Sequence, residues 1–292
     1  MYHHYPVLHR EIIQIIRTEV KREAIFVDCT LGLAGHSSLI IPLLPSGSYV
    51  FLLDKDNETI KIVKQKLDDK LDDLVKSKPW KDFKILNISF SEFFESFKFD
   101  KGFLVALADL GISYYQIKNQ PGFSFEQNTF LDMRCDKSQS LTAFEIINNY
   151  PPEKLYNILN HVLQNGKLSF RIVESIVKHR RAKKIQTTYD LNKVISKIVS
   201  SKILKDTLQK VYLSLRIHVN QEDKELISFL EFFKKYKDDF LLMIISYHSI
   251  EGKIVKSFIK DTGFRYQKIK PTKQEIEENK PSRSAILWVI RR

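Results

Sequence analysis

The chain has 292 residues, of which 43% are hydrophobic, so it can bury a substantial core in one large or two small domains. Its 47 Lys and Arg against 35 Asp and Glu give a net charge of +12, which favours a polyanionic partner, although a lysine-rich genome would raise this number too. No apolar run reaches the roughly 18 residues that span a bilayer, no secretion signal is evident, and Cys29 and Cys135 do not form a metal-type pair, so we expect a cytoplasmic protein that is not bound to a membrane or a metal.

The first part of the chain alternates between amphipathic stretches and apolar runs. Residues 6–22 carry apolar side chains at helical spacing, with Pro6 suited to the first turn, and predict a helix. Residues 24–29, 49–54, 83–87 and 103–109 predict buried strands, and residues 36–44 and 57–74 predict helices between them. This alternation is typical of a parallel, doubly wound α/β sheet.

The pattern changes after Gly111. Residues 114–136 predict an irregular segment, and the chain then has helical spacing to about residue 215, with helices at 141–148, 153–163, 167–181 and 191–199. A helix at 222–235 and a strand at 240–246 follow, and residues 264–270 and 286–291 could form two closing antiparallel strands. The simplest architecture is a Rossmann-like α/β domain, residues 1–115 and 220–292, that is interrupted by an inserted all-helical domain, residues 116–219.

The positive charge is concentrated in the inserted segment. Residues 160–220 contain 13 Lys and Arg but only 3 Asp and Glu. A uniform compositional bias could contribute but would not place nearly all of the net charge in one segment, so we expect this segment to face a polyanionic partner.

A loop with two glycines follows the first predicted strand. The strand ends in Asp28, and Gly32 and Gly35 allow a tight turn before a helix, an arrangement that brings a small ligand to the carboxyl end of a strand. Asp54 ends the second strand about 20 residues later, where a carboxylate can accept hydrogen bonds from ribose hydroxyls. The spacing fits both nicotinamide-dependent and S-adenosylmethionine-dependent enzymes, and an ordinary strand-to-helix turn with a capping acid remains the simpler alternative.

Two further strand ends carry groups suited to chemistry. Asp109 ends the fourth strand, where it could orient a cofactor or an acceptor amine, or only cap a turn. His248 follows the strand at 240–246 and could transfer a proton near neutral pH, although a single His is more often structural. No hydrolase elbow, P-loop or metal-ligand cluster is present in the sequence.

The irregular segment is rich in aromatic and charged residues. Phe123 and Phe125 could stack on bases, but anchoring to the core is the more common role of such residues. Asp132 and Arg134 predict a structural ion pair.

Several blocks of the sequence, in order, are together similar to one family. They are His4-Tyr-Pro-Val-Leu8, Val27-Asp-Cys-Thr-Leu-Gly-Leu-Ala-Gly-His-Ser37, Asp54-Lys-Asp56, Ser89-Phe-Ser91, Asp109-Leu-Gly-Ile-Ser113, Gly122-Phe-Ser-Phe125, Leu131-Asp-Met-Arg134, Ile245-Ser-Tyr-His-Ser-Ile-Glu251 and Ser282-Arg-Ser-Ala285. The chain thus resembles the RsmH/MraW family, bacterial methyltransferases that use S-adenosylmethionine to modify N4 of a cytidine in 16S ribosomal RNA, in the decoding-centre region of the small subunit.

The resemblance implies a Rossmann-like class I methyltransferase sheet with an inserted helical domain that recognises RNA. It implies S-adenosylmethionine as cofactor and 16S ribosomal RNA or the small ribosomal subunit as partner. The cofactor-binding residues that it implies are Ala34, Gly35, His36, Asp54, Phe90, Asp109 and Gln116.

Methyl transfer to an exocyclic amine suggests the catalytic roles. That nitrogen is a poor nucleophile, and a carboxylate that accepts its N–H would favour attack, so Asp109 is the first candidate and His248, as proton acceptor, the second. Phe123, Phe125, Tyr114 or Tyr115 could stack on bases beside the flipped target. A nicotinamide-dependent oxidoreductase and a non-catalytic RNA-binding protein remain the alternatives.

Overall fold

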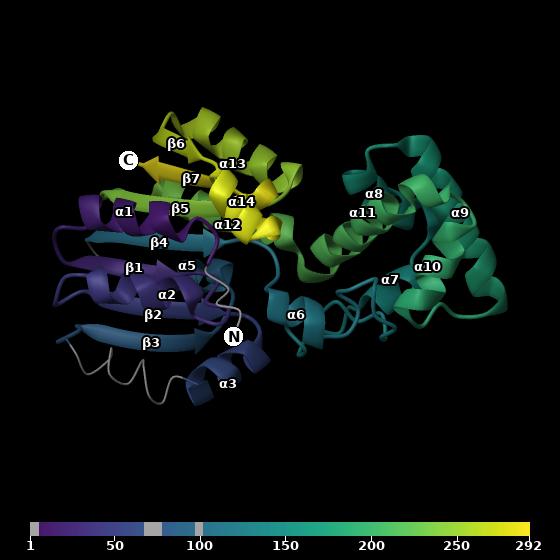
Figure 1. Ribbon diagram of the computed structural model, residues 1–292, viewed down its shortest axis with the longest axis horizontal. Helices are drawn as coiled ribbons and strands as arrows, with labels where there is room; N and C mark the ends of the chain where they lie inside the picture. Colours follow the sequence, from purple (N-terminus) through teal and green to yellow (C-terminus); the bar gives the residue numbers. More distant parts are fainter. Residues whose placement is uncertain (1–5, 67–77, 97–101) are drawn as a thin grey trace. The chain divides into compact units, whose positions relative to one another are not determined.

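The described part of the chain folds as two compact units. The computed structural model describes residues 6–66, 78–96 and 102–292. The first unit, the sheet unit, comprises Met1–Gly111 and Asp223–Arg292, and the second, the helical unit, comprises Ile112–Glu222 (Figure 1). The expected insertion, residues 116–219, lies a few residues inside these bounds.

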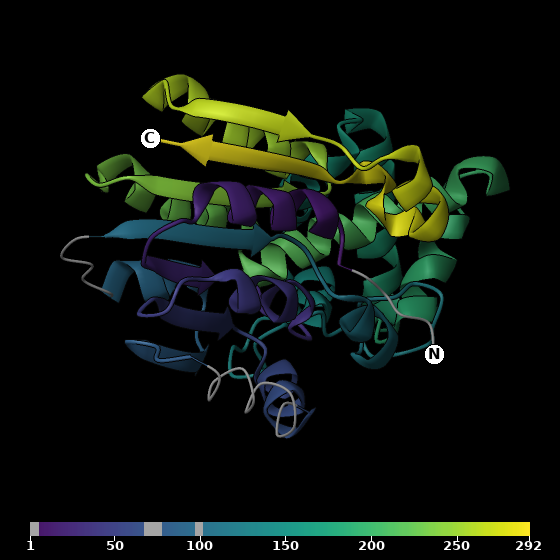
Figure 2. The ribbon, with the colours of Figure 1, turned by 60° about the vertical axis from the view of Figure 1, so that its left-hand side comes forward.

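The sheet unit is built on a seven-stranded sheet in the order β3-β2-β1-β4-β5-β7-β6. Its strands are β1 (Ala24–Asp28), β2 (Tyr49–Asp54), β3 (Asp82–Asn87), β4 (Phe103–Asp109), β5 (Phe240–Ser246), β6 (Arg265–Ile269) and β7 (Ile286–Arg291). The strands β1 to β5 run parallel, whereas β7 is antiparallel to both β5 and β6, and Figure 2 shows the arrows of β6 and β7 pointing in opposite directions. The predicted Rossmann-like α/β sheet and its antiparallel closing pair are confirmed.

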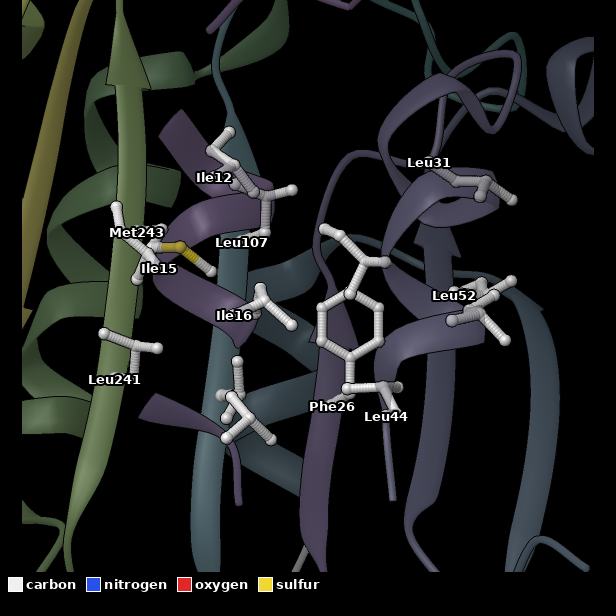
Figure 3. Packing of buried hydrophobic residues seen from close by; sticks show 14 of the residues in the cluster. Ile12, Ile15, Ile16, Phe26, Leu31, Leu44, Leu52, Leu107, Leu241 and Met243 are labelled. Carbon is white, nitrogen blue, oxygen red and sulfur yellow. The ribbon is translucent and has the colours of Figure 1, made fainter. Parts of the chain in front are cut away.

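Helices cover both faces of the sheet. One face packs against α1 (His9–Glu19), α2 (Gly35–Ile40), the 3-10 turn η1 (Ile41–Leu43) and α3 (Asn57–Lys66). Figure 3 shows Ile12, Ile15 and Ile16 of α1 directed at Leu107 and Met243 of the sheet. The other face packs against α5 (Phe90–Ser96), α12 (Glu222–Lys235) and α13 (Ser249–Thr262). The central strands are therefore buried on both sides, which is why β1 and β5 are apolar along almost their whole length.

The helical unit has its own hydrophobic core. It contains α6 (Tyr114–Asn119), α7 (Ala143–Asn149), α8 (Pro152–Leu163), α9 (Gly166–Ala182), α10 (Thr188–Ser196) and α11 (Ser201–Asn220). Fully buried residues such as Leu155, Ile172 and Leu215 hold α8, α9 and α11 together. The predicted helical character of this segment is confirmed.

Several element bounds differ from the predictions for local reasons. The first helix begins at His9 rather than Pro6, because Leu8 has a left-handed backbone with a φ of 56°. Residues 114–119 form the helix α6 within the segment predicted to be irregular, since Ser113 and Gln116 make a reciprocal capping box. The predicted helix at 191–199 begins earlier, at Thr188, where Thr187 and Asp190 form another capping box.

Other differences concern elements that the periodicity did not reveal. The helices α5, α11, α13 and α14 (Lys273–Glu278) and the 3-10 turn η2 (Lys280–Ser284) were not expected as separate elements. The second part of the predicted helix at 57–74 lies outside the described residues, as do His4 and Tyr5 of the first similar block. In the part of the chain that the structure describes, no helix is long and apolar enough to cross a membrane.

Candidate active site at the carboxyl end of the sheet

The loop between β1 and α2 turns sharply at the carboxyl end of the sheet. Gly32 and Ala34 both have left-handed backbones, with φ angles of 52° and 62°. A side chain at Gly35 would place its Cβ 2.8 Å from the Cγ of Pro6, so the segment before α1 packs directly on the loop. The glycine at this position is therefore needed for close packing with the N-terminal segment.

Asp54, at the end of β2, holds this loop from the neighbouring strand. Its Oδ2 accepts a hydrogen bond from the Gly32 N–H at 2.9 Å, and its Oδ1 accepts one from the Asp56 N–H at 2.9 Å. Burial raises the pKa of Asp54 to about 6, against the effect of these two hydrogen bonds. Each carboxylate oxygen has a second lone pair, so the side chain can still accept hydrogen bonds from a ligand.

Asp28 ties the two ends of the loop together. Its Oδ2 accepts a hydrogen bond from the Ser37 hydroxyl at 2.5 Å, and its Oδ1 accepts one from the Thr30 N–H at 3.2 Å. Thr30 in turn accepts a hydrogen bond on its hydroxyl from the Asp109 N–H at 2.7 Å, which joins the loop to the end of β4. Burial raises the pKa of Asp28, and the negative charge of the nearby Asp109 raises it further.

Asp109 lies between a tyrosine and a histidine. The Tyr247 hydroxyl donates to Asp109 Oδ1 at 2.7 Å, and His36 Nδ1 lies 3.7 Å from Asp109 Oδ2. Burial raises the pKa of Asp109 to about 7, and the negative charge of Glu251 adds to this, whereas the Tyr247 hydroxyl lowers it. The carboxyl group can therefore exchange a proton near neutral pH.

The tautomer of His36 follows from its neighbours. His36 Nε2 lies 2.9 Å from the Val7 carbonyl oxygen, which can only accept, so Nε2 carries the proton. Burial lowers the pKa of His36, so the ring is neutral and its Nδ1 presents a lone pair toward Asp109.

His248 is held by the first turn of the helix that it begins. It caps α13: Nδ1 accepts a hydrogen bond from the Glu251 N–H at 3.5 Å, and Nε2 lies 3.1 Å from Glu251 Oε1. The buried Glu251 also accepts from the backbone N–H groups of Tyr247 and His248, at 2.8 and 3.3 Å. His248 therefore has a clear structural role, which was the alternative weighed from the sequence.

The remaining predicted cofactor residues are in two places. Phe90 begins α5 just after β3, is half-buried, and meets the ring of Phe229 edge-on at 5.1 Å between centroids. Gln116 belongs to the helical unit, where its side-chain oxygen accepts from the Ser113 N–H at 2.9 Å. The sheet unit alone thus brings Ala34, Gly35, His36, Asp54 and Asp109 to its carboxyl edge, whereas Gln116 caps α6 in the other unit.

The structure of the helical unit decides between the roles that the sequence left open for the aromatic and charged residues of the segment 114–136. Asp132 and Arg134 form the expected ion pair, with Nε 2.7 Å from Oδ1. Phe123 is buried in the core, so the suggestion that it stacks on a base is wrong, and Phe125 packs edge-on against Tyr212. Tyr114 is exposed and carries the Lys118 ammonium over its ring at 4.6 Å.

Sequence reasoning gave no role to Asp28, Thr30, Ser37 and Tyr247, which complete the hydrogen-bond network. Asp28 and Thr30 carried a detectable signal, because polar residues at the end of a buried strand lie at the same edge as the predicted loop. The sequence carried no signal for Tyr247 beyond its place beside His248, because its hydrogen-bond partner, Asp109, lies 138 positions earlier in the chain.

Comparison with known proteins identifies the family. The MraW methylase family matches residues 1–292. A protein of Caldicellulosiruptor saccharolyticus named ribosomal RNA small subunit methyltransferase H is 34% identical, and the match covers 99% of this chain and 99% of that protein. Proteins of the same name from a Sulfurihydrogenibium species and from Mycoplasmopsis synoviae are also 34% identical, over 100% of both chains and over 98% of this chain and 97% of the other.

The matches to solved structures are more distant. One, titled as an rRNA methylase from Streptococcus thermophilus, is 10% identical, with a TM-score of 0.38 over 96% of this chain and 93% of that one. The assignment therefore depends on the sequence relatives and on the family match along the whole chain. On these grounds the chain belongs to the MraW methylase family.

Proposed function

We propose that this protein transfers a methyl group from S-adenosylmethionine to N4 of a cytidine in 16S ribosomal RNA, in the decoding-centre region of the small subunit. Membership of a methylase family supports the reaction class. The full-length relatives named ribosomal RNA small subunit methyltransferase H support ribosomal RNA as the substrate.

The observation that best supports the cofactor is the acidic character of the sheet edge. Asp28, Asp54 and Asp109 all have raised pKa values, with burial as the main cause and a neighbouring carboxylate as a further one in each case. S-adenosylmethionine supplies an electrophilic methyl group on a positively charged sulfur. A cationic ligand would favour the ionised form of these carboxylates, whereas the pyrophosphate of a nicotinamide dinucleotide would add further negative charge. The acids therefore favour the methyltransferase over the oxidoreductase alternative.

The proposed cofactor-binding residues follow the family resemblance. Asp54 would accept hydrogen bonds from the ribose hydroxyls, and the half-buried Phe90, one turn beyond the adjacent strand, would contact the adenine. The complete proposed set is Ala34, Gly35, His36, Asp54, Phe90, Asp109 and Gln116.

Asp109 is the proposed catalytic residue. As a carboxylate it would accept a hydrogen bond from the N4 amine, which directs the nitrogen lone pair toward the methyl group, and could then take up the proton released on transfer. We retain His248 as the second candidate. Its cap on α13 and its contact with Glu251 would have to open before it could accept a proton from the substrate.

The helical unit is the proposed RNA-binding part. Most of the net charge lies in residues 160–220, which supports phosphate contacts, with the small ribosomal subunit or its RNA as partner. Since Phe123 is buried, base stacking would fall instead to exposed rings of this unit, namely Tyr114, Phe130, Phe170 and Tyr189.

The test is transfer of tritium from methyl-labelled S-adenosylmethionine to small subunits and to naked 16S RNA from a strain that lacks the modification. The modified nucleoside is then mapped by mass spectrometry. We expect N4-methylcytidine with the wild-type protein and at least a hundredfold slower transfer with Asp109→Asn. RNA binding without any cofactor binding would favour a non-catalytic RNA-binding protein, and dinucleotide binding would favour the oxidoreductase.

A further inference from the structure

Tyr247 connects the carboxyl ends of two adjacent strands at the candidate site. In the register of β4 and β5, Asp109 lies opposite Ile245, so the chain just beyond β5 passes beside Asp109. The Tyr247 hydroxyl donates to Asp109 Oδ1 at 2.7 Å. The Tyr247 ring also packs beside Gly111, where an added Cβ would lie 3.8 Å from its Cδ2.

The tyrosine is itself firmly held. Its backbone N–H donates to Glu251 Oε2 at 2.8 Å, and Glu251 is only 4% exposed at the start of α13. On the other side of Asp109, the Thr30 hydroxyl accepts from the Asp109 N–H at 2.7 Å. Both the backbone and one carboxylate oxygen of Asp109 are therefore fixed by the protein.

These contacts distinguish the two oxygens of Asp109. Oδ1 is occupied by the Tyr247 hydroxyl, whereas Oδ2 lies 3.7 Å from His36 Nδ1, which is too long for a hydrogen bond. His36 cannot donate from that nitrogen in its neutral form, because its proton is on Nε2. Among the described residues none donates a hydrogen bond to Oδ2, which leaves this oxygen for a ligand.

We propose that Tyr247 is a positioning residue for methyl transfer: its hydroxyl holds Asp109 in the orientation and the ionised form in which Oδ2 accepts the N–H of the substrate amine. The inference rests on the proposed function. It adds a residue that acts through Asp109 without touching the substrate.

The charged groups around Asp109 determine how the Tyr247 hydroxyl affects the ionisation of this carboxyl group. Asp28 on β1, His36 on α2 and Glu251 on α13 surround Asp109, and Glu275 on α14 lies on the side of Tyr247. Burial and Glu251 raise the pKa of Asp109, and the Tyr247 hydroxyl is the group that opposes them. Burial also raises the pKa of Tyr247 itself, so the hydroxyl remains a donor throughout the working pH range.

The test is the pH profile of kcat/KM for Tyr247→Phe, which keeps the ring and removes only the donor. A hydrogen bond lowers the pKa of a carboxylate by about one unit. Its loss in Tyr247→Phe should therefore move the acidic limb of the profile to a higher pH by about that amount. Activity at pH 7 should fall by roughly fivefold and return to the wild-type value near pH 9. Tyr266→Phe is the matched control, because Tyr266 is 55% exposed on β6, and its profile should equal that of the wild type.

Each outcome is informative. An unchanged profile for Tyr247→Phe, or a loss of activity that is equal at every pH, would overturn the positioning role while leaving the methyltransferase function intact. A wild-type protein that transfers no methyl group to small-subunit RNA would instead overturn the proposed function, and the role of Tyr247 with it.

Discussion

Replacing Asp109 with Asn should make the protein more stable at pH 8 while it slows methyl transfer at least a hundredfold. The pKa of Asp109 is raised from 3.8 to about 7, so the folded protein binds more protons than the unfolded chain between these values. Stability from this group is complete below about pH 4 and is lost as the pH rises through 7. Above pH 7 the ionised carboxylate lowers the free energy of unfolding by up to about 4 kcal/mol, which is the equivalent of a shift of roughly three pKa units.

The expected gain is smaller than this upper bound. The Asp109 side chain is 27% exposed, and solvent reduces the cost, so we expect Asp109→Asn to add about 2 kcal/mol at pH 8. The Asn carbonyl can still accept from Tyr247, and its amide can face the lone pair of His36 Nδ1.

Thermal unfolding followed at pH 5 and pH 8 measures this difference. For a unit the size of the sheet unit, 2 kcal/mol corresponds to a rise in Tm of about 4–8 °C at pH 8, with less than half of that rise at pH 5. A change in Tm that is the same at both pH values would refute the reasoning, because it would mean that Asp109 does not titrate between them.

Three other predictions concern the ligand, the RNA and the core. S-adenosylmethionine should release protons when it binds near pH 6.5, and its product S-adenosylhomocysteine should release fewer, because only S-adenosylmethionine adds the positive charge of a sulfonium beside Asp54 and Asp109. Calorimetry in two buffers of different ionisation enthalpy measures this release, and equal release by the two ligands would contradict the prediction. If Lys183 and Lys184 both contact phosphates, replacing them with Ala should reduce the slope of the logarithm of the RNA-binding constant against the logarithm of the salt concentration by about one for each lysine. Alanines at two exposed lysines of the sheet unit should leave this slope unchanged. Asn220→Ala should destabilise the helical unit by about 2 kcal/mol in urea unfolding, because the buried amide bonds the Cys135 N–H at 2.8 Å and the Met133 carbonyl at 2.8 Å; an unchanged midpoint would argue against this bridging role.

The strands were the most predictable part of the fold. The ranges 49–54, 103–109 and 240–246 agree with the structure at both ends. Strands in a parallel sheet are buried on both faces, so each reads as an uninterrupted apolar run that stops where the chain reaches solvent. The acids that end two of these strands could be located for the same reason.

Helix starts were less predictable, because they depend on caps that periodicity does not detect. The start of α13 is the clearest case, since its capping residue is His248, and His is not a common residue at this position. A histidine next to a strand end suggested proton transfer, and only the contacts with Glu251 reveal the cap. In α6 a Ser–Gln capping signal was present at Ser113 and Gln116, but the short apolar pattern hid the helix.

Long-range pairs could not be predicted from the sequence at all. Tyr247 and Asp109 meet because β5 pairs with β4 in one particular register, and a shift by one residue would turn the side chains to the other face. Nothing in the local sequence around either residue specifies that register. The sequence therefore located both strand ends but not the hydrogen bond between them.

The glycine loop, Gly32-Leu-Ala-Gly35, does not follow the Gly-x-Gly-x-x-Gly pattern of dinucleotide-binding turns. That pattern exists so that free backbone N–H groups can bind a pyrophosphate. Here the Thr30 N–H is bound by Asp28, the Gly32 N–H by Asp54, and the N–H groups of Leu31 and Ala34 by the carbonyls of Leu53 and Leu31. A phosphate bound to these four N–H groups would have to break their hydrogen bonds and would then lie beside the Asp28 and Asp54 carboxylates. The loop thus has the shape of a nucleotide-binding turn beside two carboxylates, and such surroundings favour a positively charged ligand such as S-adenosylmethionine over a pyrophosphate.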